Sequence, residues 1–405
     1  MLHRYSIKNF LSFADLTEVS LRLTDKASTS GWHARSPSGQ RFTTAMAVVG
    51  PNGGGKTSLL KPLAFLRWFI ADSFNGLSPN DELPIKPHFT KPDEPIEFEF
   101  EADDGEGTMW RYVLRTTSQR VLHEAVYQKP KNRKTYSYVF LRDWDDLTDA
   151  YAIKQKGYGF LSAEAKKVRS NASLISTAAQ YGVPLAQALA NVNVVSNINV
   201  MGRIYVDPFC MGAAEYFHEN SKLRLQMETL LSSWDMGLAG IDIRRVSVGK
   251  IPSAKERTEE TAEDVQYVPY GIHKLADGST HALPMHEESN GTRAAFNNLW
   301  LFLEVLSTGG LAVIDELESD MHPRMLEPLL GLFANPRTNP HQAQVIFTCH
   351  AAEVLNLLSK SQVMLVEKVD CRSEAWRLDS MTGVRSQDNL YAKYMSGAYG
   401  AVPKL

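Results

Sequence analysis

The chain has 405 residues, of which 43% are hydrophobic and 22% charged, and its formal net charge is −3. This length exceeds the usual size of a single domain, so we expect two domains or one large domain with an insertion. A nearly neutral chain is unlike proteins that coat nucleic acid non-specifically, although a local basic patch remains compatible with it.

The cysteine content and the lack of long apolar runs suggest where the protein works. Cys210, Cys349 and Cys371 are far apart in the sequence and show no paired spacing. Neither a disulfide framework nor a zinc site is therefore indicated, which fits a reducing cytoplasm. No apolar run reaches about eighteen residues, and the N-terminus has no secretion signal. We expect a cytoplasmic protein without a membrane partner.

The N-terminal part predicts strands, then a helix. Short strands are expected over residues 5–13 and 16–23, followed by a polar loop over 24–40. Residues 44–50 form an apolar run that ends in glycine, as expected of a buried strand. Apolar residues then recur at helical spacing over 56–74, which predicts an amphipathic helix.

The middle of the chain predicts an antiparallel sheet, then helices. Apolar residues alternate on both sides of an Asp-Asp-Gly-Glu-Gly turn within residues 94–117, which is typical of a hairpin. Residues 121–129 and 135–143 would add two strands to it. From about residue 150 to 235 the pattern is helical.

Two apolar strands near the C-terminus predict a parallel sheet. Residues 311–316 and 343–349 are apolar almost throughout and flank a helical segment, which indicates a strand-helix-strand unit. The other predicted elements in this part are a strand over 240–249, an exposed loop over 254–266, and helices over 292–310 and 321–334.

The strongest motif is GPNGGGKTS, which follows the predicted strand over 44–50 and matches the phosphate-binding pattern G-x-x-x-x-G-K-[ST]. Glycines let backbone N–H groups curl around phosphate, and the following helix adds the positive end of its dipole. Lys56 would reach the β- and γ-phosphates, and the Thr57 hydroxyl would hold Mg²⁺. The candidate nucleotide-binding residues are Gly50, Pro51, Asn52, Gly53, Gly54, Gly55, Lys56, Thr57 and Ser58.

Two carboxylates and a histidine follow the two C-terminal strands. Asp315 at the end of the first strand is a candidate Mg²⁺ ligand, and Glu316 after it can orient and deprotonate water. His350 ends the next strand, where it could hydrogen-bond the γ-phosphate. Glu318 and Asp320 are interpreted as surface charge.

A second candidate anion site precedes the helix over 292–310. Ser289 is a candidate helix N-cap, and Asn290 and Gly291 follow it, so this helix start offers hydroxyl and backbone donors. A phosphate-binding loop and a second such helix start rarely converge on one nucleotide within one fold. Two copies arranged head to tail could bring them together.

Four stretches of the chain together resemble the ATP-binding-cassette type of ATPase head found in SMC and OLD ATPases. They are GPNGGGKTS, ESNGTR, LAVIDELESDMHP and FTCH. They are particularly similar to the stand-alone AAA-ATPases of prokaryotic abortive-infection systems, as are the two ends of the chain. The resemblance implies ATP and Mg²⁺ as cofactors and a homodimer or higher homo-oligomer. In it, Ser289–Thr292 would be the signature loop that closes on the ATP of a second subunit.

The chain also departs from that pattern. The signature differs from the Leu-Ser-Gly-Gly-Gln type of transport cassettes, and no glutamine suits the loop that senses the γ-phosphate; His88 is a weak substitute. Sustained heptads for coiled-coil arms are missing. Only 55 residues follow His350, which is too short for the nuclease domain of OLD proteins. His281 and His286 fit no metal-ligand spacing.

A basic stretch gives nucleic acid as a further candidate partner. Lys129, Lys131, Arg133 and Lys134 stand beside Tyr136 and Tyr138, and such residues can grip a nucleic-acid backbone and stack bases. The simpler interpretation, which we favour, is a solvated hairpin tip.

We therefore predict an α/β P-loop NTPase resembling an ABC-ATPase head, with a parallel core sheet, an antiparallel β-subdomain and a helical insertion. It would be an ATPase that dimerises around ATP and controls a separate effector, a nuclease or a toxin, in anti-phage defence. The alternatives are an ATPase that handles DNA directly, a transporter motor, and a scaffold that sequesters a toxin. The expected domains are an N-terminal ATPase lobe over 1–90, a β-subdomain over 91–145, a helical insertion over 146–235 and a C-terminal ATPase lobe over 236–405.

Overall fold

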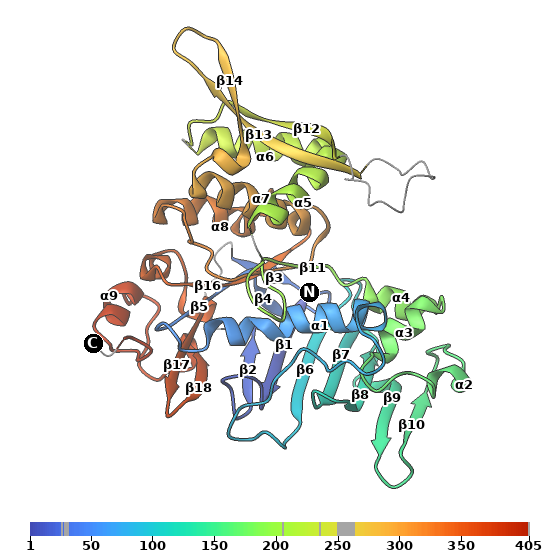
Figure 1. Cartoon of the computed structure of the whole chain (residues 1–405). Coiled ribbons are helices and arrows are strands. Elements are labelled where there is room, and N and C mark those ends of the chain that lie inside the picture. The colour runs from blue at the N-terminus through green and yellow to red at the C-terminus, as the bar shows by residue number, and fades with distance from the viewer. Residues whose placement is uncertain (26, 28–31, 205, 235, 249–263, 404–405) are drawn as a thin grey trace, which may run out of the picture. The chain divides into compact units, whose positions relative to one another are not determined.

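The computed structural model describes residues 1–25, 27, 32–204, 206–234, 236–248 and 264–403 (Figure 1). The chain divides into two compact units. The first unit comprises Met1–Arg203, Val305–Leu317 and Leu330–Leu405, and the second comprises Ile204–Glu304 and Glu318–Leu329. The four domain boundaries expected from the sequence remain predictions. Most of the loop expected over 254–266 lies outside the described residues, and its last three residues belong to a strand.

The first unit contains a seven-stranded antiparallel sheet with the order β10-β9-β8-β7-β6-β1-β2. Its strands are β1 (Leu2–Lys8), β2 (Thr17–Ser20), β6 (Ile96–Asp103), β7 (Met109–Thr116), β8 (Val121–Lys129), β9 (Ser137–Asp145) and β10 (Ala150–Gln155). The four strands predicted between 94 and 143 are confirmed. They form one sheet with the two N-terminal strands because β1 pairs with both β2 and β6.

The same unit contains a six-stranded sheet with the order β11-β15-β16-β5-β17-β18. Its strands are β5 (Ala45–Val49), β11 (Val194–Ser196), β15 (Leu311–Ile314), β16 (Gln344–Cys349), β17 (Val363–Val369) and β18 (Arg372–Arg377). All neighbours in it pair in parallel except β17 and β18. Every residue of β5, β15 and β16 is buried, which explains why these three strands read as continuous apolar runs.

Two strands fall inside the region where the sequence predicts helices, and there the prediction is wrong. Residues 150–155 form β10, which pairs with β9 across a tight turn. Their exposure alternates because one face is solvated, so the apolar pattern is weak. Residues 194–196 form β11, which pairs in parallel with β15. A strand of three residues carries too little periodicity to be recognised locally.

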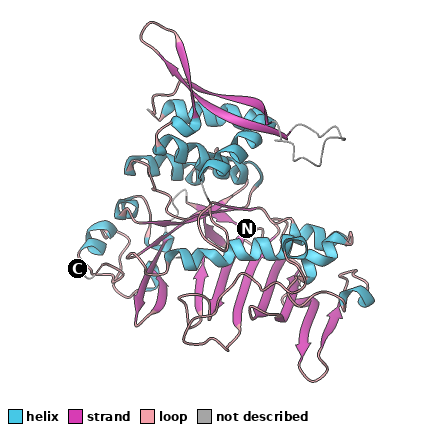
Figure 2. Ribbon diagram, viewed as in Figure 1, coloured by secondary structure: helices cyan, strands magenta, loops and turns pink. Residues whose placement is uncertain are grey.

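Helix α1 (Lys56–Gly76) joins the two sheets of the first unit into one core. Figure 2 shows it as a long helix crossing the strands of the antiparallel sheet. One buried cluster includes Leu59 and Phe65 of α1, Phe98 of the antiparallel sheet, and Val313 and Ile346 of the parallel sheet. The predicted helix after GPNGGGKTS is therefore confirmed, and its burial ties the loop before it to both sheets.

A buried polar network holds the far end of the antiparallel sheet. Glu124 of β8 and Arg142 of β9 are fully buried, with Oε2 and Nη1 3.4 Å apart. Glu124 also accepts hydrogen bonds from the hydroxyl of Ser173 at 2.6 Å and the backbone N–H of Leu174 at 2.9 Å. Ser173 in turn caps helix α3 (Leu174–Gln180), so the network attaches this helix to the sheet.

The second unit combines helices with a three-stranded antiparallel sheet of order β12-β13-β14. Phe217 and Phe296 are fully buried and pack 5.6 Å apart between ring centroids. Its elements are α5 (Val206–Glu219), α6 (Ser221–Ser233), β12 (Gly240–Val248), β13 (Asp264–Lys274) and β14 (Thr280–Pro284). Helices α7 (Asn290–Thr308) and α8 (Leu326–Ala334) start in the second unit and end in the first.

The remaining elements are short. They are β3 (His33–Arg35), β4 (Arg41–Thr43), α2 (Ser162–Ala165), α4 (Pro184–Ala190), α9 (Leu390–Met395), and the 3₁₀ turns Met285–Glu287, Pro323–Met325, Ala352–Asn356, Lys360–Gln362 and Leu378–Ser380. Within the described part of the chain, no helix combines the length and the apolar character that a membrane crossing requires.

Candidate nucleotide-binding site

The parallel sheet brings the predicted residues of the first unit together at one edge. β5, β11, β15 and β16 run in the same direction, so their carboxyl ends meet there. The loop 50–55 follows β5, Asp315 and Glu316 follow β15, and His350 follows β16. Open α/β sheets bind their ligands outside this edge.

The loop 50–55 has a backbone that only glycines allow. Gly53 and Gly55 have φ of +72° and +114°, in the region that side chains rarely adopt. A Cβ on Gly50 would lie 2.0 Å from the backbone oxygen of Val366, so β17 packs directly against the loop. The loop then enters α1 at Lys56, as the motif predicts.

Lys56 is buried at the centre of this loop. Its Nζ donates to the backbone oxygens of Gly50 at 2.9 Å and Pro51 at 3.1 Å, and lies 3.3 Å from Nδ1 of His350. The lysine and the histidine predicted from separate motifs thus meet. The ammonium group of Lys56 can replace its hydrogen bonds to the backbone oxygens of Gly50 and Pro51 with hydrogen bonds to phosphate oxygens.

Asp315 lies against the first turn of α1. The Thr57 hydroxyl is 3.0 Å from each of its carboxylate oxygens, and the Thr348 hydroxyl donates to Oδ1 at 2.8 Å. Asp315 is 4% exposed, so these hydroxyls take the place of water as its hydrogen-bond partners. Burial also lowers the pKa of nearby Lys61, which the charge of Asp315 opposes.

Glu316 is held in a strained backbone conformation. Its φ is +52°, which is unfavourable for a residue with a side chain, and its N–H donates to the Thr348 hydroxyl at 2.6 Å. Its carboxylate oxygens face two different partners: Nη1 of Arg203 is 2.7 Å from Oε2, and Nε2 of His350 is 3.5 Å from Oε1. Such strain is often found at functional sites.

Asn197 was not identified from the sequence, although it lies beside the two acids. Its Oδ1 accepts the N–H of Asp315 at 2.8 Å, and its Nδ2 donates to the backbone oxygen of Asp315 at 2.9 Å. It follows β11, which is the strand that the sequence pattern missed. A polar residue directly after a short Val-Val-Ser run was the only local signal.

His88 is not suited to the role of a γ-phosphate sensor. It is fully buried, with Nδ1 2.8 Å from the hydroxyl of Thr90 and Nε2 3.1 Å from the backbone oxygen of Cys371. Both ring nitrogens are therefore engaged within the protein. The weak sequence interpretation of this residue is wrong because the chain between α1 and β6 folds it inward.

Two serines, also unrecognised in the sequence, lie behind the loop. The Ser373 hydroxyl donates to the backbone oxygen of Gly54 at 2.7 Å, and the Ser373 N–H donates to the backbone oxygen of Ser12 at 2.7 Å. A Cβ on Gly55 would lie 2.4 Å from Oγ of Ser373 and 2.9 Å from Oγ of Ser12. The two serines thus fix the second half of the loop from the β18 side.

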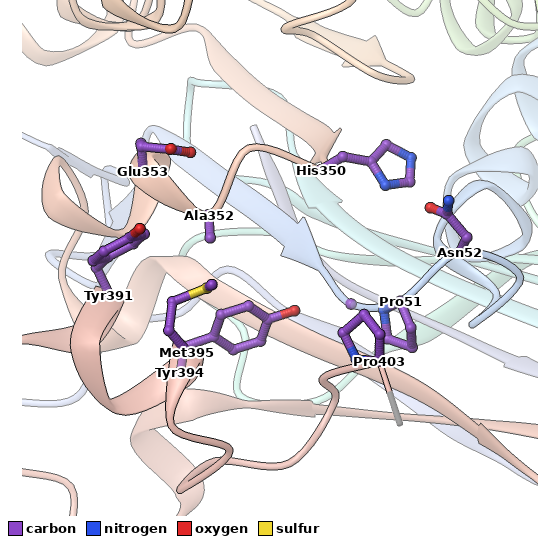
Figure 3. A pocket seen from close by; sticks show the side chains of 10 residues that line it. Pro51, Asn52, His350, Ala352, Glu353, Tyr391, Tyr394, Met395 and Pro403 are labelled. Atoms are coloured by element: carbon purple, nitrogen blue, oxygen red, sulfur yellow. The ribbon is translucent and has the colours of Figure 1, made fainter. Parts of the chain in front are cut away.

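A pocket of about 800 Å³ opens beside the loop. Figure 3 shows Asn52 and His350 at one side of it and residues of the C-terminal helix α9 at the other. Tyr394 of α9 is buried, and its hydroxyl donates to the backbone oxygen of Ala401 at 2.8 Å. Burial raises the pKa of Tyr394 to about 12, so the phenol is neutral at ordinary pH. The lining residues are Gly50, Pro51, Asn52, His350, Ala352, Glu353, Tyr391, Tyr394, Met395 and Pro403.

Ser289, Asn290 and Gly291 belong to the second unit. The Ser289 hydroxyl accepts the N–H of Thr292 at 3.1 Å, so Ser289 caps α7 as the sequence predicts. A Cβ on Gly291 would lie 2.8 Å from the backbone oxygen of Asp320, and glycine is therefore required at this close contact. Ser289 and Asn290 are exposed.

The basic stretch forms the turn between β8 and β9, and Lys131, Arg133 and Lys134 are exposed there. Tyr136 is occupied within the sheet: its hydroxyl donates to Glu101, and the guanidinium of Arg111 lies 4.2 Å from its ring centroid. His281 and His286 are exposed, and no group of three or more metal-ligating side chains occurs among the described residues.

The residues present fit a nucleotide with a magnesium ion. At Gly55 a side chain would collide with the serines behind the loop, so glycine permits this backbone, whose N–H groups can surround phosphate. The Thr57 hydroxyl and the Asp315 carboxylate are oxygen donors, which Mg²⁺ prefers.

A glycine-rich loop between a buried parallel strand and a helix, with acids at the end of a nearby parallel strand, defines a P-loop NTPase. Residues 45–356 match the family described as "AAA domain, putative AbiEii toxin, Type IV TA system". The match spans most of the chain, and the protein belongs to this AAA family. The predicted fold class and the predicted resemblance to AAA-ATPases are thereby confirmed.

Solved structures of SMC heads are similar to this chain at low identity. The SMC head domain from Thermotoga maritima is 13% identical, with a TM-score of 0.41, and covers 93% of this chain and 98% of its own. The SmcHead bound to the C-winged helix domain of ScpA is 10% identical, with a TM-score of 0.46, and covers 95% and 99%. The Smc head domain derived from Pyrococcus furiosus, bound to the C-terminal domain of ScpA, is 10% identical, with a TM-score of 0.41, and covers 94% and 97%. No curated protein matches the chain significantly.

Proposed function

We propose that the protein binds and hydrolyses ATP and uses the nucleotide state to control a separate effector. The observation that carries the proposal is the 3.0 Å approach of the Thr57 hydroxyl to Asp315. It brings the P-loop helix and the acidic end of β15 to the distance at which both can serve one metal ion. Membership of the AAA family also supports the proposal that the protein binds and hydrolyses ATP.

In the proposed reaction, backbone N–H groups at Gly53–Ser58 and the ammonium of Lys56 bind the phosphates of ATP. Thr57 and Asp315 would hold Mg²⁺, which would neutralise charge on the phosphate oxygens. Glu316 accepts a proton from a water molecule, whose oxygen bonds to the γ-phosphorus. The bond from the γ-phosphorus to the bridging oxygen breaks, which leaves ADP and phosphate. His350 positions the γ-phosphate from the end of β16.

A second copy completes the site in this proposal. Ser289, Asn290 and Gly291 stand at the exposed start of α7, where backbone donors and the helix dipole favour an anion. The resemblance to ATPase heads supports their closure on the ATP of the partner subunit. ATP would then join two copies, and hydrolysis would release them. The nucleotide state would thereby determine whether the two copies are associated.

The effector would be a nuclease or a toxin, and the setting anti-phage defence. The family description, which names a toxin and a type IV toxin–antitoxin system, supports this setting. The second candidate is direct action on nucleic acid, favoured by the exposed Lys131, Arg133 and Lys134 at the β8–β9 turn. The engagement of Tyr136 with Glu101 favours the effector proposal, because that ring is not free to stack on bases.

The first experiment measures phosphate release and sedimentation with ATP and Mg²⁺. Lys56→Ala should lose nucleotide binding, while Glu316→Gln should bind ATP, hydrolyse it slowly and accumulate as a dimer. Glu374→Gln, which changes an exposed carboxylate on β18, is the matched control and should behave as the wild type. Wild-type turnover by Glu316→Gln would contradict the assignment of the base.

A pull-down from the host then tests which partner the ATP-bound protein retains. Glu316→Gln protein with ATP and Mg²⁺ should retain a small protein that Lys56→Ala does not retain. Recovery of nucleic acid without a protein would favour the second candidate. In that case, changing Lys131, Arg133 and Lys134 together should abolish the recovery.

A further inference from the structure

Arg203 engages the side chain proposed as the catalytic base. Its Nη1 lies 2.7 Å from Oε2 of Glu316, while Nε2 of His350 lies 3.5 Å from the other carboxylate oxygen. Both oxygens of Glu316 therefore face nitrogen partners. The ion pair holds the carboxylate in one orientation, and its release would let the side chain turn toward a water molecule.

The position of Arg203 is built by a tight turn. Asn199 accepts the N–H groups of Met201 at 2.8 Å and Gly202 at 3.0 Å through its side chain, and its own N–H donates to the backbone oxygen of Gly202 at 2.8 Å. Ile198 and Arg203 form an isolated antiparallel bridge across the turn. The turn follows Asn197, which is itself bonded to the backbone of Asp315 on both sides. Arg203 is thus anchored to the same strand end as its target.

Arg203 also ends the first segment of the first compact unit, and the second unit begins at the next residue, Ile204. Glu316 lies just before another such junction, between Leu317 and Glu318, so both members of the ion pair stand close to places where the chain passes from one unit to the other. The ion pair is partly exposed, with 40% of the Arg203 side chain and 38% of the Glu316 side chain accessible, so it can open without uncovering a buried charge.

We propose that Arg203 is an autoinhibitory latch that restrains Glu316 until the second unit is displaced. The proposal rests on the proposed function and adds its regulation: an isolated copy hydrolyses ATP slowly because its base is paired, and assembly pulls Arg203 away. The partner that releases the latch is a second copy of this chain bound through ATP.

The test compares Arg203→Ala and Arg203→Lys with the wild type over a range of protein concentrations. Arg203→Ala should raise kcat about two- to fivefold at low concentration, as expected for loss of a partly exposed ion pair. Its KM should be unchanged and its activity should depend less on protein concentration. Arg203→Lys keeps a cation and should stay near the wild type. Arg67→Ala, which removes a partly exposed arginine paired with Asp72 on α1 at 3.5 Å, is the matched control.

Hydrogen exchange gives a readout that does not depend on turnover. Without nucleotide, Arg203→Ala should speed exchange in peptides covering 197–204 and 314–317, and Arg67→Ala should not. A fall in kcat of Arg203→Ala at every concentration would mean that Arg203 orients Glu316 productively, and this would overturn the latch. Unchanged kcat and exchange would overturn it too. Wild-type turnover that survives Glu316→Gln would instead overturn the proposed function, and the latch with it.

Discussion

The hydroxyl of Thr348 donates to Oδ1 of Asp315 at 2.8 Å, and the oxygen of this hydroxyl accepts the N–H of Glu316 at 2.6 Å. Thr348 is fully buried on β16 and joins the two acids at the end of β15. Its replacement by valine keeps the shape and leaves a buried N–H without its acceptor. We expect Thr348→Val to lower kcat by roughly ten- to a hundredfold with little change in KM.

Steady-state kinetics of Thr348→Val and Thr348→Ser would check this expectation. The serine variant keeps the hydroxyl and should retain most of the activity. Full activity in Thr348→Val together with a loss in Thr348→Ser would show that the methyl group, not the hydroxyl, matters at this position.

Ser373 should matter for nucleotide affinity. Its hydroxyl bonds the backbone oxygen of Gly54 and so holds the phosphate loop from behind. Ser373→Ala should weaken ATP binding by about five- to tenfold, the value of one hydrogen bond. Titration with a fluorescent ATP analogue measures the change. Ser380→Ala, which removes an exposed hydroxyl bonded to Arg377, should leave the affinity unchanged.

The Glu124–Arg142 pair should be essential for stability. Arg142 is fully buried and also donates to the backbone oxygens of Ala172 and Arg169, both at 2.7 Å. Glu124→Ala leaves this guanidinium without a counter-charge, and we expect a loss of about 3–5 kcal/mol in the free energy of unfolding. The partly exposed pair of Lys8 and Glu97 gives the control.

Glu97→Ala should cost about 0–1 kcal/mol, as is usual for an exposed pair. Urea unfolding followed by circular dichroism measures both variants. A similar small loss for Glu124→Ala would mean that water enters the site and solvates Arg142.

Glu101 should make stability depend on pH in the acid range. Burial raises its pKa, but hydrogen bonds from Tyr136 and Arg4 and the charge of Arg22 outweigh burial and lower the pKa from 4.5 to about 2. The ionised group therefore stabilises the fold above about pH 4.5, and this contribution is lost as the pH falls toward about 2.

Urea midpoints of the wild type and Glu101→Gln should accordingly differ near pH 6 and converge as the pH approaches about 2. Glu18→Gln removes an exposed carboxylate that also contacts Arg4 and should stay close to the wild type throughout. A constant difference between the wild type and Glu101→Gln would show that Glu101 keeps its ordinary pKa in the folded protein.

The sequence allowed the phosphate loop and the acidic strand end to be predicted because both are encoded locally. A buried strand, a glycine pattern and a helix follow one another within residues 44–74, and Asp315 directly follows its strand. Their meeting at one edge of the sheet follows from parallel pairing, which the apolar strands indicated.

The contacts that complete the site could not be predicted, because they join distant segments. Asn197 and Arg203 reach the two acids through β11, and three half-buried residues carry no recognisable period. Ser373 lies more than three hundred residues after the loop that it holds. His88 remained a candidate phosphate sensor in the sequence because nothing local shows that this histidine is buried.

The conformation of the phosphate loop depends on segments of the chain outside residues 50–58. The space around Gly50 is bounded by the backbone of Val366, and that around Gly55 by Ser373 and Ser12. A graft of residues 50–58 with β5 and α1 alone would omit the neighbouring residues that hold the loop in its conformation. The smallest unit that could be grafted includes β17, β18 and the turn at Ser12 as well, which makes the binding element a three-part piece of the chain.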